Sequence, residues 1–298
     1  MGKRAKQRLK VLKAARRAAH RYDRLRALGM TASLGTLFVV PLTGAARVDL
    51  WRGNHYLLFE RMSLRHALAG VIVGIAVMYV VTFLSNVLAG RMFCGWGCPV
   101  GQQSRFGELA DSPGFSARQR RVASLKGAAF GLLFFLSMMA WWVDLRVFWQ
   151  APALDTIVVW SILLAGGLTA WAHGRWWRWE FCKTVCPIGL YYTFVSPAKW
   201  YGVYFRNQQE SCIECNLCDH VCPVDLAPRD LLQPIPARGG VSIDEAPGRN
   251  HCLECGDCVR ACEWIIETKG DGPVPLLLGH YSGPQRIEAP DPAKRAQA

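Results

Sequence analysis

Four long apolar segments, separated by polar ones, set the pattern of the N-terminal part of the chain. They cover residues 27–46, 64–89, 124–143 and 154–172. Each has about twenty residues, which at ~1.5 Å per helical residue is enough to cross the ~30 Å hydrocarbon core of a membrane. The second segment contains LAGVIVGIAVMYVVTFLSNVLAG and is apolar on every side, whereas a surface helix of a soluble domain keeps a polar face. The pattern predicts four membrane-spanning helices.

The first apolar segment has a second interpretation. It follows a basic stretch, contains Thr, Ser and Gly, and ends in LTGAAR, as the apolar core of a cleavable signal peptide does. We expect it to be retained as a span, because it completes the repeat of paired spans described below.

The charge pattern predicts the orientation of the spans. Lys and Arg are dense before the first span, where Asp23 is the only acidic residue, and they recur in SARQRR after the second span. The loop between these two spans also carries four arginines, so the bias is uneven. Because positive residues stay on the cytoplasmic side, we expect the N-terminus in the cytoplasm. Most of the net charge of +13 is then explained by the orientation of the spans in the membrane, and we expect no nucleic-acid partner.

All twelve cysteines fall in tight clusters, which is typical of metal sites in a reducing compartment rather than of disulfides. Two clusters share one frame: FCGWGCPVG begins at Phe93 after the second span, and FCKTVCPIG begins at Phe181 after the fourth. The sequence therefore predicts a repeat of two helical hairpins, each followed by a cytoplasmic Cys-x3-Cys-Pro elbow. Gly-x3-Gly pairs in the second and third spans would let these helices pack closely; they are Gly70 with Gly74 and Gly127 with Gly131.

The cysteines of the two elbows have three interpretations, which the sequence leaves open. They are Cys94, Cys98, Cys182 and Cys186. The first interpretation is a third iron–sulfur centre. The second is a redox-active thiol pair or a copper site, since thiolates select Cu(I) as well as iron–sulfur clusters. In the third, Pro99 and Pro187 simply make exit turns and the thiols are inert.

The other eight cysteines form two runs near the C-terminus, CIECNLCDHVCP and CLECGDCVRACE. The first is the bacterial ferredoxin pattern for a [4Fe-4S] cluster, and the second has the same spacing with Glu263 in place of proline. In such pairs the fourth cysteine binds the other cluster. We therefore predict one cluster on Cys212, Cys215, Cys218 and Cys262, and a second on Cys252, Cys255, Cys258 and Cys222. Structural zinc is the weaker alternative, because zinc needs only four ligands, commonly as two separated pairs.

The pattern gives a domain plan and a fold class. We expect a basic arm over residues 1–26, a transmembrane domain over 27–190, a ferredoxin domain over 200–270 and a flexible tail over 271–298. The fold class is a membrane α-helical bundle of four spans with a C-terminal α+β domain of the bacterial 2[4Fe-4S] ferredoxin type. Such a module carries single electrons and would suit exchange with a lipid-soluble quinol, whose oxidation needs a proton acceptor. Candidate acceptors are Glu60, His66, His173 and Glu180.

Together, the four spans, CGWGCPVG, CKTVCPIG and the two ferredoxin runs resemble the NapH/MauN family of membrane ferredoxin-type subunits, over residues 27–268. The resemblance implies a quinol dehydrogenase subunit of the bacterial inner membrane, with its ferredoxin domain in the cytoplasm. Its expected partners are membrane lipid, quinol and other redox subunits, of periplasmic ferredoxin or cytochrome type. Copper-reducing maturation proteins of haem–copper oxidases, and membrane regulators of nitrous oxide reduction, share the pattern and give the alternative of a thiol or copper reductase.

Overall fold

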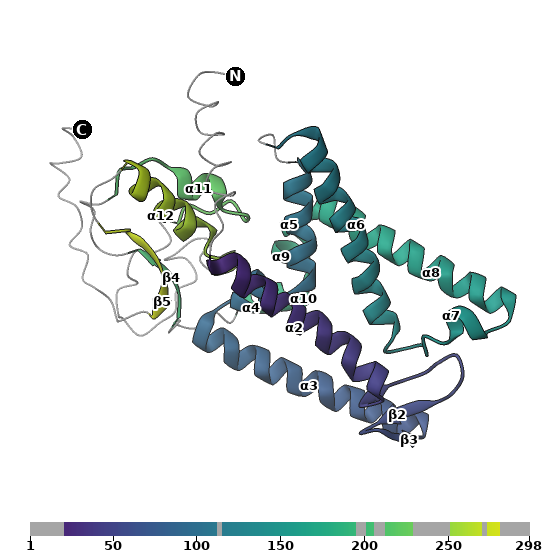
Figure 1. Cartoon of the computed structure of the whole chain (residues 1–298). Helices are drawn as coiled ribbons and strands as arrows, with labels where there is room; N and C mark the ends of the chain where they lie inside the picture. The colour runs from purple at the N-terminus through teal and green to yellow at the C-terminus, as the bar shows by residue number, and fades with distance from the viewer. Residues whose placement is uncertain are drawn as a thin grey trace. The chain divides into compact units, whose positions relative to one another are not determined.

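Four helices in the computed structural model are long and apolar enough to cross a membrane, as the sequence predicts (Figure 1). They are α2, Arg21–Thr43; α3, Leu64–Ala89; α6, Ala117–Met139; and α8, Ala153–Ala172. Apolar side chains are exposed even at neighbouring positions of α3: Ile72 is 65% exposed and Val73 is 61% exposed. Lipid tails cover an apolar surface of this kind in a membrane. The helical content and these four helices indicate a membrane protein.

The structure describes residues 21–111, 115–194, 201–205, 212–228, 251–269 and 273–280. Most of the expected basic arm and of the expected tail therefore lies outside the described residues. The chain forms two units. The membrane unit comprises Asp23–Leu84 and Phe93–Thr184, and the cysteine unit comprises Met1–Tyr22, Ser85–Met92 and Val185–Ala298. The domain limits expected from the sequence stay predictions.

Two of the helices extend beyond their apolar segments at the N-terminal side. Helix α2 already includes Arg21, the first residue that the structure describes, and ends where Gly44 takes a left-handed φ of 79°. Helix α6 begins at Ala117 rather than residue 124, because Ser116 and Gln119 form a capping box. The arginines of SARQRR therefore lie in the first turns of a helix and not in a loop. Hydrophobicity locates a span, but the cap decides where the helix starts.

A small antiparallel sheet joins α2 to α3, and the sequence analysis did not foresee it. Its strands are β1, Ala46–Arg47; β2, His55–Leu57; and β3, Glu60–Met62, in the order β1-β2-β3. The backbone amides of Val48 and Leu50 donate to the carbonyls of Trp141 and Trp142, at 2.9 and 3.0 Å. These bonds fasten the first hairpin loop to the turn between α6 and α8.

Helices α6 and α8 pack against each other along glycines (Figure 1). A Cβ on Gly131 would lie 3.0 Å from the carbonyl oxygen of Gly167, so the two backbones come together where side chains are absent. The Gly127 and Gly131 pair therefore lies at helix contacts, as predicted. Gly70 and Gly74 do not: the atoms nearest to a Cβ on Gly70 belong to the side chain of Leu57, and in the described part of the chain nothing lies within 4 Å of a Cβ on Gly74.

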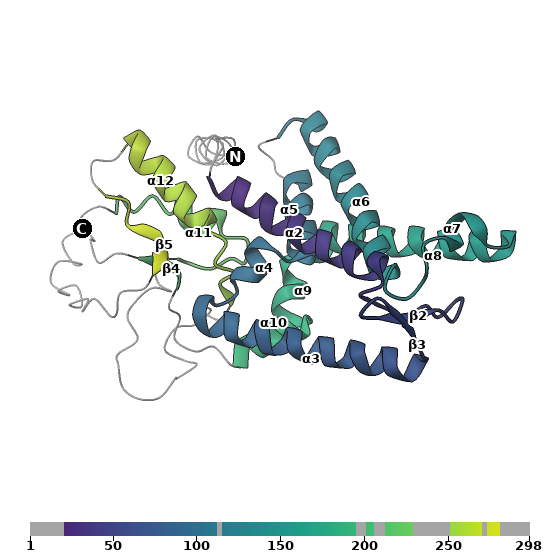
Figure 2. The ribbon, with the colours of Figure 1, turned by 60° about the horizontal axis from the view of Figure 1, so that its bottom comes forward.

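Short helices complete the membrane unit. They are α4, Met92–Trp96; α5, Pro99–Asp111; α7, Val147–Gln150; the π-helix η1, His173–Trp177; and α9, Trp179–Thr184. Helix α7 packs beside α8, and Val147 and Phe148 enter an apolar core with Met139, Val159 and Leu163. Helix α5 lies against both α6 and η1 (Figure 2).

Among its described residues, the cysteine unit contains a two-stranded antiparallel sheet and three helices of its own. The strands β4, Tyr201–Phe205, and β5, Leu276–His280, pair over their whole length (Figure 2). The helices are α10, Pro187–Phe194; α11, Leu217–Val221; and α12, Asp257–Lys269. Helix α12 packs against both α11 and β5, so the two cysteine runs meet across the helices that follow them.

We predict that Gly107→Ala destabilises the membrane unit by about 1–3 kcal/mol, because overpacking a tight contact costs that much. A Cβ on Gly107 would collide with the carbonyl oxygen of Gly174. Gly74→Ala is the matched control, since its Cβ would meet nothing and alanine favours the helix by about 0.5–1 kcal/mol. Thermal unfolding of the detergent-solubilised protein should give a lower midpoint for Gly107→Ala only. Equal midpoints would show that the close contact between α5 and η1 is absent.

Candidate functional site

The two cysteine runs of the cysteine unit fold into loops of the same form. In the first, Glu214 and Asn216 take left-handed φ values of 48° and 56°; in the second, the equivalent Glu254 and Gly256 take 50° and 74°. Left-handed residues at alternating positions curl a loop so that its backbone N–H groups face inward, as in many iron–sulfur sites. The strain of three non-glycine residues in this region is the kind of backbone cost that functional sites carry.

Four cysteines line one pocket at the first loop. They are Cys212, Cys215, Cys218 and Cys262: the first two come from the loop, the third from α11 and the fourth from α12. Apolar side chains close the pocket, among them Ile265 and Leu276, and its empty volume is about 360 Å³, part of it open to solvent. Soft thiolates inside an apolar wall fit an iron–sulfur cluster.

The second loop lies close to Cys222, the last cysteine of the first run. Burial raises the pKa of the Cys258 thiol well above its usual range, and the charges of Cys255, Cys252 and Cys222 raise it further. Effects of this kind weaken with distance, which is consistent with the set predicted for the second cluster. The sulfur of Cys222 also accepts a hydrogen bond from the amide of Leu226 at 3.3 Å. Both ligand sets, and the assignment of clusters to them, stay predictions.

Among the described residues, no three Cys, His, Asp or Glu side chains are grouped tightly enough to hold a single metal ion. A [4Fe-4S] cluster is a different case, because each of its irons binds a different thiolate and the four sulfurs stand farther apart.

The residue after the fourth cysteine decides how each run ends. Pro223 follows Cys222, and α11 ends at Val221, since proline disfavours helix in the residue before it. Glu263 follows Cys262, and α12 continues through both residues to Lys269. Because no proline interrupts the helix here, Cys262 projects from within it.

The two elbows also share a local form. In each, a short helix precedes the second cysteine, and the next helix begins at the proline: α4 precedes α5 at Pro99, and α9 precedes α10 at Pro187. Proline suits this first helical position, because the amide it lacks would have no partner in the helix. All four elbow cysteines are partly buried. A repeat of two whole hairpins, and a centre made of all four thiols, stay hypotheses.

Contacts within each unit link segments that belong to different elbows. In the membrane unit, Trp179 of α9 packs beside Gly101 of α5 and donates from Nε1 to Glu108 at 2.7 Å. In the cysteine unit, the guanidinium of Arg91, which precedes Cys94, donates to the carbonyl of Gly189, which follows Cys186. Arg91 is buried, and its guanidinium lies 5.7 Å from the ring centroid of Tyr192.

Two further arginines stack on elbow aromatics in the membrane unit. Arg26 lies 5.5 Å from the ring centroid of Trp96, between Cys94 and Cys98, and Arg105 lies 5.7 Å from that of Trp179. Such cation–π pairs hold positive charge in place at low solvent exposure. Arginines thus stack on aromatic rings in the segments that flank the elbow cysteines.

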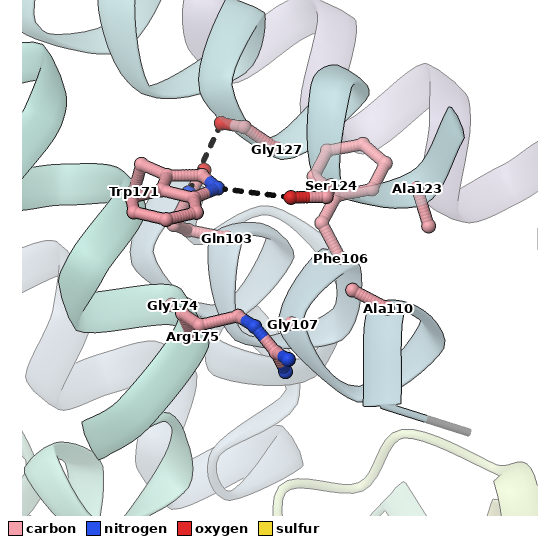
Figure 3. A pocket seen from close by; sticks show the side chains of 10 residues that line it. All are labelled: Gln103, Phe106, Gly107, Ala110, Ala123, Ser124, Gly127, Trp171, Gly174 and Arg175. Atoms are coloured by element: carbon pink, nitrogen blue, oxygen red, sulfur yellow. Dashed lines mark hydrogen bonds between the residues drawn. The ribbon is translucent and has the colours of Figure 1, made fainter. Parts of the chain in front are cut away.

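A pocket lies where α5, α6 and η1 meet, just beyond the first elbow (Figure 3). Its empty volume is about 170 Å³. Trp171 donates from Nε1 to the hydroxyl of Ser124 at 3.3 Å, and Gln103 donates from Nε2 to the carbonyl of Gly127 at 3.0 Å. Gln103 is only 3% exposed, and its Oε1 is buried with no hydrogen-bond partner. An unsatisfied buried acceptor of this kind is costly, and it marks a place for a donor group.

Two ion pairs hold one wall of this pocket in place. Both Arg175 and Arg178 bind the carboxylate of Asp111 at the end of α5. Arg175 also lines the pocket, and Figure 3 shows its side chain beside Gly107 and Gly174. The π-helical turn at His173–Trp177 brings Gly174 against Gln103; single π turns are frequent at functional sites. Gln103 carries no sequence signal of its own, and only the packing of α5 singles it out.

The predicted proton acceptors occupy different settings. His66 and Glu60 are exposed at the start of α3 and in β3, and Nδ1 of His66 lies 2.8 Å from the Ser63 hydroxyl. Glu180 is exposed and binds Lys183 at 2.8 Å. His173 is half-buried beside the Phe181 ring, and its Nε2 is buried without a hydrogen-bond partner. His173 directly precedes the pocket residue Gly174, so it is the best placed of the four for chemistry there.

Known proteins with related sequences are ferredoxin-type and electron transport proteins. The chain is 26% identical over 230 residues to the methylamine utilization ferredoxin-type protein MauN of Methylorubrum extorquens, covering 68% of this chain and 75% of that protein. It is 25% identical over 213 residues to the putative electron transport protein YccM of Escherichia coli, covering 63% of this chain and 53% of that protein.

A third relative is an uncharacterized protein, MJ0750, of Methanocaldococcus jannaschii, 20% identical over 218 residues that cover 69% of this chain and 81% of the relative. No protein-family model and no solved structure matches the chain. The relatives support an electron-transfer role, and their ferredoxin-type names with the twelve cysteines are consistent with iron–sulfur clusters.

We predict that cluster-free protein is alkylated more slowly at Cys262 than at the exposed Cys215. Burial raises the pKa of Cys262 to about 11, and only the thiolate reacts, so at about pH 8 roughly one Cys262 in a thousand is reactive. Because the thiolate forms as the pH rises through the pKa, the Cys262 rate should climb about tenfold per pH unit up to about pH 11. Mass spectrometry after iodoacetamide pulses measures both rates. A Cys262 rate that levels off near pH 9 would contradict the prediction.

Proposed function

We propose that this chain is a membrane-bound quinol dehydrogenase subunit of the NapH/MauN type. In this proposal it takes electrons from quinol in the bacterial inner membrane and passes them through two [4Fe-4S] clusters on its cytoplasmic side. A partner redox subunit, of periplasmic ferredoxin or cytochrome type, then carries them to a periplasmic enzyme. The observation that carries the proposal is the pair of like-shaped cysteine loops, in one chain with four helices able to span a membrane.

The electron count supports two clusters in such a protein. Oxidation of quinol to quinone releases two electrons and two protons, and each bound [4Fe-4S] cluster supplies a one-electron carrier. The eight cysteines of the two runs are the residues that would hold these clusters: Cys212, Cys215, Cys218 and Cys262 for one, and Cys252, Cys255, Cys258 and Cys222 for the other. The thiols must lose their protons on loading, so the raised pKa values of Cys258 and Cys262 make cluster assembly a proton-releasing step.

The pocket of Figure 3 supports a place for the quinol head group. Phe106 and Trp171 provide aromatic walls, and the unsatisfied Oε1 of Gln103 can accept a hydrogen bond from a quinol hydroxyl. Because its empty volume of about 170 Å³ includes space open to solvent, the pocket would take a head group only after the surrounding side chains move apart. His173, which directly precedes the pocket residue Gly174, is the proton acceptor that this proposal assigns.

The test is anaerobic reduction of the purified, cluster-loaded protein by a quinol analogue, followed as bleaching of the iron–sulfur absorbance. We predict rapid bleaching in the wild type. Gln103→Leu should slow it about tenfold, since a lost hydrogen bond of about 1.5 kcal/mol is worth that factor. Reduction by dithionite should be unchanged in the variant. No bleaching by quinol, with dithionite still effective, would mean that electrons reach the clusters by another route.

A thiol or copper reductase that serves the maturation of a respiratory metalloenzyme is the second candidate function. The observation in its favour is the cationic setting of the elbows, where Arg26, Arg91 and Arg105 stack on aromatic rings. Positive charge promotes the thiolate form that attacks disulfides or binds Cu(I). The same charge would also offset the negative charge of a third cluster, so a third iron–sulfur centre stays the rival hypothesis for these cysteines.

Counting iron and acid-labile sulfide in a variant with Ser at positions 94, 98, 182 and 186 separates these hypotheses. A third centre predicts a fall of about one third in iron, from about twelve to about eight per chain. A thiol or copper site predicts unchanged iron and sulfide with loss of Cu(I) binding. Substitution of the two C-terminal runs is the positive control, because it should remove the ferredoxin-type clusters whichever hypothesis holds.

A further inference from the structure

Two glutamates occupy the same place in the two cysteine runs but lie in opposite environments. Glu214 precedes Cys215 and Glu254 precedes Cys255, in the shared order Cys-x-Glu-Cys. Their backbones match, with left-handed φ values of 48° and 50°. Glu214 is exposed, whereas Glu254 is 1% exposed. The chain therefore carries a natural pair in which only the surroundings of the carboxylate differ.

Strand β4 is what buries Glu254. The amide of Val203 donates to its Oε2 at 2.6 Å. The neighbouring residue is Gly202, and a Cβ there would lie 2.8 Å from the same oxygen, too near for any side chain. Burying a carboxylate is costly unless its oxygens are hydrogen-bonded, and β4 provides such a bond and the room beside it. Strand pairing with β5 holds β4 in this position.

We propose that Glu254 is a potential-setting residue: its buried carboxylate lowers the reduction potential of the cluster on Cys252, Cys255, Cys258 and Cys222. Reduction adds a negative charge to a cluster, and a fixed negative charge nearby opposes that addition. The opposition is strong in the low-dielectric interior, where Glu254 lies. At Glu214 water and salt screen the same charge, so the cluster on Cys212, Cys215, Cys218 and Cys262 is affected little.

The consequence is an unequal distribution of electrons between the two clusters. Two clusters of unequal potential do not share electrons evenly, and the first electron to enter rests on the cluster of the first run. The cluster beside Glu254 then passes electrons on without keeping them. This inference rests on the two-cluster part of the proposed function and does not depend on quinol as the donor.

The test is an anaerobic redox titration of the full-length, cluster-loaded protein, followed by electron paramagnetic resonance. The wild type should show two separate one-electron waves. In Glu254→Gln, which keeps the size and the hydrogen-bond acceptor, the lower wave should shift upward by about tenfold in its reduction equilibrium, equal to about 59 mV. Glu214→Gln, the matched control, should shift neither wave by more than about twofold.

Other outcomes are decisive as well. A single wave in the wild type, or equal shifts in the two Gln variants, would overturn the proposal. If Glu254→Gln alone loses iron, Glu254→Asp, which keeps the charge, decides the matter. The proposal stands if the Asp variant loads fully and titrates as the wild type does. Otherwise Glu254 is needed for folding, and the proposal is overturned. Fewer than about eight irons per wild-type chain would instead refute the two-cluster function, so the two failures are distinguishable.

Discussion

The contact between Gly107 of α5 and Gly174 of η1 is the constraint on which the membrane unit depends. The two backbones are so close that no side chain fits at either glycine. Their approach sets Gln103 beside Gly174 and puts Arg175 within reach of Asp111. It also brings α9 near α5, where Trp179 can bond Glu108. The pocket, the ion pairs and the contact between α5 and α9 thus all depend on the close approach of these two glycines.

In the cysteine unit the equivalent constraint is a backbone conformation. Each loop must turn back on itself so that three cysteines face one centre, and left-handed residues at alternating positions achieve this turn. Glycine would do so most easily, but three of the four positions carry Glu or Asn. These residues keep the strained conformation in the folded protein. At Glu254 this conformation fixes a carboxylate within the second run.

The sequence predicts what depends on local patterns and misses what depends on packing. Twenty apolar residues make a span wherever they occur, so α3 and α8 begin and end close to the predicted limits. Cysteine spacing likewise names four thiols that line one pocket, those of Cys212, Cys215, Cys218 and Cys262. By contrast, the sheet between α2 and α3 forms from strands of only two or three residues, too short for a periodic signal. Glu214 and Glu254 are identical in sequence context, and only β4 tells them apart.

The same distinction shows where charge matters in this chain. Most of its positive charge lies at helix ends and in polar segments, where solvent screens it and topology explains it. Arg26 and Arg91 are exceptions, because both are buried and both stack on aromatic rings. A buried cation is retained only when something nearby compensates its charge. Arg26 has such a partner in Asp23, 3.9 Å away, and the guanidinium of Arg91 donates to the carbonyl of Gly189, so the burial of both cations follows from contacts within their own units.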